Sequence, residues 1–226
     1  MNEAVKKMTE KIRKDFFSQK EFTENASHET QTPLAVIKAR LDLLLQSQNL
    51  RESDMQQLEV IEHAVAKLSS LNKALLLLAK IENNQFKGIE EVDIENVLNK
   101  TLMVFEDLIV SKNINVEKNI KGNSRINIDP ILADILISNL LQNAVRHNEH
   151  GGKIEIELNP HSFSIANTGK PLIIKPEELM ERFKKNEGSQ ESIGLGLSIV
   201  KSILDSYNYE LSYSYKEGNH IFEIKF

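Results

Sequence analysis

A histidine near the N-terminus is surrounded by residues that suit chemistry better than packing. His28 is followed by the carboxylate of Glu29, and Thr32 lies one helical turn further on. Counted as a helix at about 100° per residue, the segment places its apolar residues on one stripe and His28 on the opposite side. That stripe consists of Phe22, Ala26, Pro33, Ile37, Leu41 and Leu44. An imidazole exposed to solvent beside a carboxylate can act as a nucleophile near neutral pH, so the sequence predicts a reactive histidine.

A second group of polar residues lies on a helix expected between Pro130 and Asn148. Asn139 and Asn143 are four residues apart and share one face, which Arg146 and His147 extend by another turn. Amide oxygens are ligands that Mg²⁺ accepts, and an arginine can contact a phosphate directly. Taken alone, these side chains are better explained as the solvated face of an ordinary helix.

Two glycine-containing segments could approach a phosphate group. Asn167-Thr168-Gly169 follows an apolar strand, and Gly194-Leu195-Gly196-Leu197 opens a helix. Glycines at a helix N-terminus let backbone N–H groups approach a phosphate, and the helix dipole assists. The dinucleotide-binding fingerprint is excluded because its third glycine is missing and the preceding segment is a loop. The polar, lysine-rich residues 170–193 between the two segments could close over a ligand as a lid.

The reactive histidine must be positioned by long helices. Residues 2–47 contain no glycine and one proline, which predicts a helix bent at Pro33. A polar turn at 46–53 follows, with Ser53 or Asp54 as the N-cap of a second helix that ends near Glu82. Two such helices form an antiparallel hairpin, which would pair with a second copy as a four-helix bundle.

The second helix carries a seam of apolar residues with three-four spacing: Leu58, Ile61, Val65, Leu68 and Leu75. Asn72 is the polar position in that seam, where it would either fix the register of a dimer or simply be exposed. A purely structural dimerisation coil would explain the seam equally well, but it would not explain His28.

Beyond residue 90 the pattern changes to mixed helix and strand. Strands are expected at 92–94, 115–120, 124–128, 153–158, 163–167, 210–215 and 220–226, and helices at 95–112, 130–148 and 197–207, with a short helical piece at 177–183. This order predicts helices layered on one face of a mixed sheet. The predicted organisation is a helical hairpin at 1–84, a hinge at 85–90 and a second domain at 91–226, which makes the chain an α+β multidomain protein.

Composition limits the classes of function. The 226 residues have a net charge of -5, which argues against a nucleic-acid-binding body, and they contain no cysteine, which excludes disulfides and thiolate metal sites. The longest apolar run, Ala74 to Ala79, is far shorter than a membrane span, and the charged N-terminus does not suit a signal peptide. We therefore expect a soluble chain.

In this order, the motifs resemble those of the sensor histidine kinases of bacterial two-component systems, over almost the full length of the chain. The segment around His28 is similar to the phosphoacceptor box, and Asn139-Leu140-Leu141-Gln142-Asn143-Ala144 is similar to the N box. Asn167-Thr168-Gly169 and Gly194-Leu195-Gly196-Leu197 resemble the two glycine boxes, and Glu181-Arg182-Phe183 resembles the F box. The resemblance implies a dimeric four-helix bundle for dimerisation and histidine phosphotransfer, followed by a GHKL-type ATP-binding α/β sandwich. Because members of this family are commonly membrane-anchored, it also implies a cytoplasmic chain, with a membrane anchor only in an upstream segment absent from this sequence.

The resemblance also implies roles for the residues of the hairpin. His28 would receive the γ-phosphoryl group of ATP. Glu29 would orient the imidazole and accept its other ring proton, which leaves one nitrogen free to attack. Thr32 matches the position linked to dephosphorylation of the partner regulator.

In the second domain the resemblance implies an ATP site with Mg²⁺. Asn143 would hold the metal, Asn139 would assist at the phosphates and Arg146 would contact them. His147 stands where the family often has an aromatic residue beside the adenine. The other residues that the resemblance places at the nucleotide are Asn167, Gly169, Gly194, Leu195, Gly196 and Leu197.

Three positions depart from the family pattern. Asn167 stands where the family usually has an aspartate that reads the adenine amino group, so the acceptor is kept but its charge is lost, which predicts modest affinity. Pro171 replaces the second glycine of the first glycine box and stiffens the chain there. Ser192 replaces a glycine that is often found two positions before Gly194.

The leading hypothesis is ATP-dependent autophosphorylation on His28, followed by transfer to an aspartate of a response-regulator receiver domain, with regulator phosphatase activity through Thr32. The alternative is a regulator phosphatase or docking dimer that binds nucleotide weakly. A GHKL-type ATPase is disfavoured because Asn139 stands where related ATPases have a glutamate that activates water. Three other histidines, His63, His161 and His220, are expected to be surface or hairpin residues.

Overall fold

The chain divides into two compact units, Met1–Asn83 and Asn84–Phe226. The computed structural model describes residues 5–6, 8, 30–45, 51–172, 175–184 and 193–226. The predictions for His28, Glu29 and Ser192 lie outside the described residues. Within the described parts of the chain, none of the helices combines the length and apolarity that crossing a bilayer requires.

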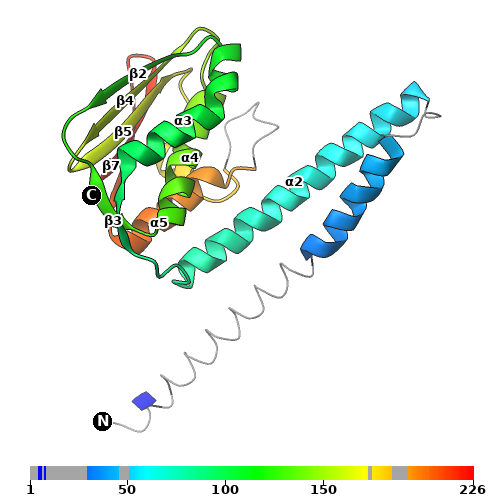
Figure 1. Ribbon diagram of the computed structural model, residues 1–226, viewed down its shortest axis with the longest axis horizontal. Helices are drawn as coiled ribbons and strands as arrows, with labels where there is room; N and C mark the ends of the chain where they lie inside the picture. The colour runs from blue at the N-terminus through cyan, green and yellow to red at the C-terminus, as the bar shows by residue number, and fades with distance from the viewer. Residues whose placement is uncertain (1–4, 7, 9–29, 46–50, 173–174, 185–192) are drawn as a thin grey trace. The chain divides into compact units, whose positions relative to one another are not determined.

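The first unit contains two neighbouring helices, helix 30–45 and the longer α2 (Glu52–Glu82) (Figure 1). Asn72 Nδ2 donates a 2.6 Å hydrogen bond from α2 to Oγ1 of Thr30, so this polar position of the seam contacts the other helix of the same chain. The predicted end of α2 near Glu82 is confirmed.

The N-cap of α2 differs from the prediction of Ser53 or Asp54. Arg51 occupies that position with extended backbone, and its carbonyl oxygen accepts hydrogen bonds from the N–H groups of Asp54 and Met55. Asp54 lies inside the first turn, where its carboxylate is favourably placed near the helix N-terminus and 3.5 Å from Arg51 Nε. The ion pair therefore holds the side chain that was expected to cap the helix.

The apolar residues of α2 divide between a buried and an exposed set. Val65 is buried within the unit, whereas Ile61, Leu68 and Leu75 keep 46%, 52% and 37% of their surface exposed. The three exposed residues are spaced by seven, so they form one stripe along the helix. A single chain leaves this stripe in water.

The second unit is built on a five-stranded mixed sheet (Figure 1). Its strand order is β2 (Asn115–Ile120), β4 (Lys153–Asn159), β5 (Ser162–Thr168), β7 (Asn219–Lys225) and β6 (Glu210–Lys216). The pair β2–β4 is parallel and the other pairs are antiparallel. A separate antiparallel pair, β1 (Glu90–Asp93) with β3 (Arg125–Ile128), was not anticipated from the sequence.

Three helices cover one face of the sheet, as predicted: α3 (Ile94–Ser111), α4 (Pro130–Arg146) and α5 (Gly196–Tyr207) (Figure 1). The apolar side chains of β4 and β5 that face them are buried, including Ile154, Ile156, Phe163 and Ile165. Alternation along these strands places the charged side chains on the opposite face, which accounts for the pattern in the sequence. The predicted helical piece at 177–183 is instead a short 3₁₀ helix, η1 (Pro176–Met180).

The start of α4 is fixed by several groups. Pro130 occupies its first turn, and the side chain of Asp129 accepts a hydrogen bond from the N–H of Ile131 as an N-cap. The other carboxylate oxygen accepts from the N–H of Gly88, and the hydroxyl of Tyr207 accepts from the N–H of Asp129. The helix that carries the candidate site residues is therefore anchored to both the segment before β1 and α5.

Candidate functional site

The candidate residues of α4 lie on the flank of a helix whose other side is core. Leu136, Leu140 and Leu141 of that side are buried. The polar residues of the flank, Asn139, Asn143 and Arg146, are each half-buried. The side chains of a fully solvated helix face would be more exposed. Neighbouring parts of the domain therefore partly cover these three residues.

Asn139 meets the second glycine segment. Its Nδ2 donates a 2.7 Å hydrogen bond to the carbonyl of Ile135, which directs Oδ1 away from its own helix. A Cβ added to Gly196 would lie 3.0 Å from that Oδ1. The amide flank of α4 and the first residue of α5 are therefore in close contact, as a shared site requires.

The start of α5 is formed by the second glycine segment. Leu195 is the N-cap residue, and no side chain of the described residues caps this end. The Leu195 side chain is buried, so this residue can offer a ligand only its backbone. The first N–H groups of a helix have no partner within the helix and favour an anion.

The residues before α5 fold back onto the F-box segment. The N–H of Phe183 donates a 2.8 Å hydrogen bond to the carbonyl of Gly194, and Gly194 has a left-handed φ of 76°. A Cβ on Gly194 would lie 2.8 Å from the carbonyl oxygen of Lys184, so glycine is required there on two grounds. Lys184 pairs with Glu178 across 2.9 Å, which ties this segment to η1.

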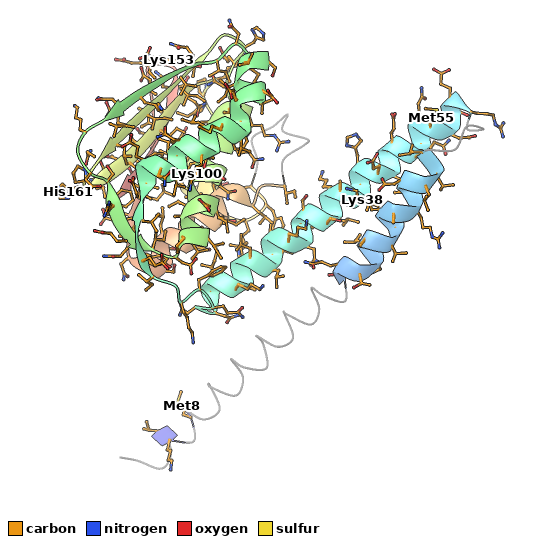
Figure 2. All side chains as sticks on the ribbon, viewed as in Figure 1. Met8, Lys38, Met55, Lys100, Lys153 and His161 are labelled. Carbon is orange, nitrogen blue, oxygen red and sulfur yellow. The ribbon has the colours of Figure 1, made fainter. Side chains whose placement is uncertain are left out.

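The end of β5 brings Asn167 to the same region. Its side chain is buried, and Nδ2 donates a 3.0 Å hydrogen bond to the carbonyl of Thr168. A carbonyl can only accept, so this bond identifies which end of the Asn167 amide is the NH₂ group. This strand end is the one beside Lys153, which begins β4, whereas His161 marks the opposite end (Figure 2).

Gly169 lies between the end of α4 and strand β7. A Cβ added here would be 3.3 Å from the carbonyl oxygen of His147 and 2.8 Å from the imidazole of His220. His220 lies in the predicted hairpin, but it is buried, with 7% of its surface exposed, and so it is not a surface residue. The sequence contained no signal for this contact because β7 is more than fifty residues away from Gly169.

A second polar network was also missed by sequence reasoning. The hydroxyl of Thr168 donates a 2.5 Å hydrogen bond to Oδ1 of Asn148 and accepts from the N–H of Lys153, while Nδ2 of Asn148 donates to the carbonyl of Lys153. These bonds join the segment after α4 to β4 and β5. A Cβ on Gly152 would collide with both the Asn148 amide and the Thr168 hydroxyl, so only glycine leaves room for the network.

Lys112 stabilises the end of α4 electrostatically. Its Nζ donates hydrogen bonds of 3.0 and 2.9 Å to the carbonyl oxygens of Val145 and Arg146, in the last turn of the helix. A cation at a helix C-terminus satisfies carbonyls that lack helical partners and interacts favourably with the dipole. The candidate residues Arg146 and His147 thus sit on a fixed helix end.

The pKa values of two histidines near the site, His147 and His220, are lowered by their surroundings. His147 lies at the surface, but partial burial of its ring lowers its pKa below 6.5, and the charges of Arg146, His220 and Lys112 act in the same direction. Burial also lowers the pKa of His220, against the opposing effect of its hydrogen bond to the Lys170 carbonyl. Both rings therefore bind a proton less readily in the folded chain than in the unfolded chain.

Acidification is expected to destabilise the folded chain through these two rings. In the unfolded chain both histidines take up protons as the pH falls through about 6.5, whereas the folded chain resists, so stability is full above that pH and declines below it. The thermal midpoint should therefore fall between pH 7 and 5, and less steeply in a His220→Gln variant. Identical pH slopes for the two proteins would contradict this prediction.

The phosphoacceptor segment is described only in part. Thr32 lies on helix 30–45 with its side chain exposed. Thr30, two residues after His28, is held to α2 by the bond from Asn72. The described part of the hairpin therefore anchors the helix next to the reactive position.

The site suits Mg²⁺ bound together with phosphates better than a metal held by protein alone. Among the described residues there is no group of three or more histidine, cysteine or acidic side chains placed to hold a metal ion. Mg²⁺ usually keeps several waters and takes only one or two ligands from the protein when phosphates complete its shell. The half-buried amide of Asn143 fits that limited role.

Comparisons with known proteins identify both units. Residues 18–84 match the family model of the His Kinase A (phospho-acceptor) domain, and residues 128–226 match that of the histidine kinase-, DNA gyrase B-, and HSP90-like ATPase. The solved structure of the Acinetobacter baumannii histidine kinase AdeS is similar, with a TM-score of 0.61 and 25% identity, over 88% of this chain and 96% of that one.

Curated relatives cover the chain nearly from end to end. Sensor protein QseC of Salmonella typhi is 27% identical over 217 residues, which are 93% of this chain and 48% of that protein. Heme sensor protein HssS of Staphylococcus saprophyticus is 31% identical over 221 residues, which are 91% of this chain and 46% of that protein. The chain spans about half the length of these relatives. With its helical unit, its GHKL-type sheet domain and both family models in order, the chain belongs to the sensor histidine kinases of bacterial two-component systems.

Proposed function

We propose that this chain is the core of a sensor histidine kinase, which transfers the γ-phosphoryl group of ATP to His28 and then to an aspartate of a response-regulator receiver domain. The observation that carries the proposal is the contact between Asn139 and Gly196. It joins an amide-bearing helix flank to a helix start whose first N–H groups have no partner within the helix, which is an arrangement suited to a triphosphate.

The first transfer needs a neutral imidazole with one free nitrogen. Glu29 orients the ring and takes the proton of its other nitrogen, while the free nitrogen attacks the γ-phosphorus. The new P–N bond forms as the bond from the γ-phosphorus to the β–γ bridging oxygen breaks, and ADP leaves. Arg146 and the N–H groups at the start of α5 stabilise the charge on the phosphates, with Asn139 positioning them.

Mg²⁺ bound through the Asn143 oxygen would screen the negative charge of the phosphates. Phosphoryl transfer depends largely on such screening and on positioning. His147 would lie beside the adenine, and the backbones of Gly169, Gly194, Leu195, Gly196 and Leu197 would line the nucleotide.

Asn167 is proposed to select the base. Its Nδ2 is engaged by the Thr168 carbonyl, which supports assigning Oδ1 as the acceptor for the base. An acceptor pairs with the amino group of adenine and repels the keto oxygen that guanine carries at the same position. The exchange of the family aspartate for asparagine therefore keeps the choice of base while weakening the bond.

Nucleotide titrations test the role of Asn167. ATP should bind the wild-type chain at least about tenfold more tightly than GTP, because a buried acceptor facing a keto oxygen is left unpaired. An Asn167→Leu variant should lose about tenfold in ATP affinity and most of the preference. Calorimetry with both nucleotides measures this, and equal affinities in the wild-type chain would contradict it.

The helical unit is proposed to supply both the dimer and the phosphoacceptor. Residues 1–84 would form the hairpin of a homodimeric four-helix bundle, with 85–90 as the hinge and 91–226 as the ATP-binding domain. The exposed stripe of Ile61, Leu68 and Leu75 supports the dimer, since a second copy would bury it. We place the chain in the cytoplasm, as the soluble portion of a membrane-anchored sensor.

The proposal is tested by incubating the chain with γ-labelled ATP and Mg²⁺. A phosphorylated histidine survives alkali and is lost in acid, whereas phosphoserine behaves in the opposite way. Label of the first kind, followed by its transfer to a receiver domain, supports the proposal. Steady release of phosphate without labelled protein would contradict it.

A second candidate function rests on Asn167. If the neutral amide binds ATP too weakly for autophosphorylation, the chain would act as a regulator phosphatase or docking dimer through Thr32. Calorimetry that detects no ATP binding in the presence of Mg²⁺, combined with faster loss of phosphate from a phosphorylated receiver domain, would favour this candidate.

A further inference from the structure

Three backbone polar groups directly after Asn167 are held by the hairpin of β6 and β7. The N–H of Gly169 donates a 3.0 Å hydrogen bond to the carbonyl of Gly218, at the tip of the hairpin. The carbonyl of Gly169 accepts a 3.1 Å bond from the hydroxyl of Tyr215. The next carbonyl, that of Lys170, is 2.9 Å from Nε2 of His220. In most loops such backbone groups are hydrogen-bonded to water. Here the β6–β7 hairpin binds all three of them.

The protonation pattern of His220 follows from its partners. The Lys170 carbonyl can only accept, so Nε2 of the neutral ring carries the proton and Nδ1 is an acceptor. The hydroxyl of Tyr213 lies 2.8 Å from Nδ1 and therefore donates to it. Tyr213 thus fixes the tautomer that lets His220 hold the Lys170 carbonyl.

Packing fixes the same ring from its sides. The ring centroid of Tyr215 lies 4.9 Å from that of His220, and Tyr213 is stacked on it at 6.1 Å. The ring of His220 is so close to the Cα of Gly169 that no side chain fits between them. A shift of the hairpin would therefore displace the backbone next to Asn167.

We propose that Tyr213, Tyr215 and His220 form a hairpin triad of positioning residues, which holds the 169–170 backbone in place for nucleotide binding by Asn167. This inference rests on the proposed function, because it assigns Asn167 to the base. The triad does not touch the reacting atoms. Its role is to keep the Asn167 acceptor and the start of the lid segment in the orientation that the nucleotide needs.

The chain offers a matched control for Tyr215. Tyr209 directly precedes β6, the first strand of the same hairpin. Its hydroxyl donates a 3.0 Å hydrogen bond to the carbonyl of Asn127, which is nearly the same length as the bond from Tyr215 to Gly169. Tyr209→Phe and Tyr215→Phe therefore each remove one tyrosine hydroxyl bonded to a backbone carbonyl. Only the second variant removes a bond at the nucleotide turn.

The test is the KM for ATP and the kcat of autophosphorylation of both variants in the full chain. Tyr215→Phe should raise the KM by about threefold to tenfold, which corresponds to one net hydrogen bond, with kcat within about twofold of wild type. Tyr209→Phe should leave both constants unchanged, although the two variants lower the thermal midpoint similarly. A His220→Leu variant should raise the KM, and His220→Gln should restore it, since the glutamine amide can donate in place of Nε2.

The outcomes separate this inference from the proposed function. Equal KM values for Tyr215→Phe and Tyr209→Phe, in a chain that labels normally, would overturn the positioning role alone. A KM that is raised by His220→Leu and not rescued by His220→Gln would also overturn it, since a general packing defect would then explain the loss. A wild-type chain that binds no ATP would overturn both proposals.

Discussion

A His28→Gln variant is expected to lose its label from γ-labelled ATP, by more than about a thousandfold relative to the wild-type chain. Glutamine is similar in size and polarity, but it offers no nucleophilic ring nitrogen, so no P–N bond can form. The remaining site is untouched, and ATP should therefore bind with unchanged affinity. Autoradiography after alkali and acid treatment measures the first effect, and calorimetry measures the second.

His63 provides the matched control for this experiment. It is an exposed histidine on α2, in the same unit as His28, and no family motif includes it. A His63→Gln variant should label like the wild-type chain. Acid-stable label that persists in His28→Gln would show that the phosphoryl group is on another residue type, and it would defeat the proposed function.

Local pattern was sufficient for most elements of the sheet domain. Alternation along β4 matches the side chains that are buried, because successive side chains of a strand point to opposite faces. Pro130 marked the first turn of α4, where a missing N–H costs nothing. These features depend on residues within one element, so the sequence contained enough information to place them.

The pairing of β1 with β3 and the burial of His220 depend on contacts between distant segments. His220 reads as an ordinary hairpin residue, and only its partners on β6 and after β5 give it a buried, bonded position. In the sequence, Asn148 looks like an ordinary solvated turn residue after a helix. In the structure its side chain is hydrogen-bonded to Thr168, twenty residues later. Composition and periodicity carry no signal for such pairs.

The motifs of the candidate site were predictable only in part from the sequence. Asn139 and Gly196 are each weak signals, and their contact across the fold is what makes them a plausible site. The order of the motifs predicted this meeting through the family resemblance, whereas no physical property of either segment did. The hydrogen bonds from the β6–β7 hairpin to the backbone after Asn167 join segments that are distant in the sequence, so only the folded structure reveals them.

A Gly152→Ala variant is expected to destabilise the sheet domain by about 3 kcal/mol, which would lower its thermal midpoint by about 6–12 °C. The added methyl group would collide with the side chains of Asn148 and Thr168 and lie 3.0 Å from the carbonyl oxygen of Glu149. The last of these is backbone and cannot move aside cheaply. The Asn148–Thr168 bond would have to break, which leaves buried polar groups without partners.

The neighbouring glycine separates this collision from a backbone effect. Gly151 has a left-handed φ of 74°, but a Cβ there would meet no atom within 4 Å, so Gly151→Ala should cost only about 1 kcal/mol of conformational strain. Thermal melts of the two variants, followed by the same titration with ATP, provide the comparison. Because Thr168 is the residue between Asn167 and Gly169, only Gly152→Ala should also weaken nucleotide binding at temperatures where both variants are folded. Equal losses of stability in the two variants would mean that the Asn148–Thr168 network around Gly152 adjusts to the added methyl group without cost. Asn148 would then have no part in holding the backbone next to Asn167.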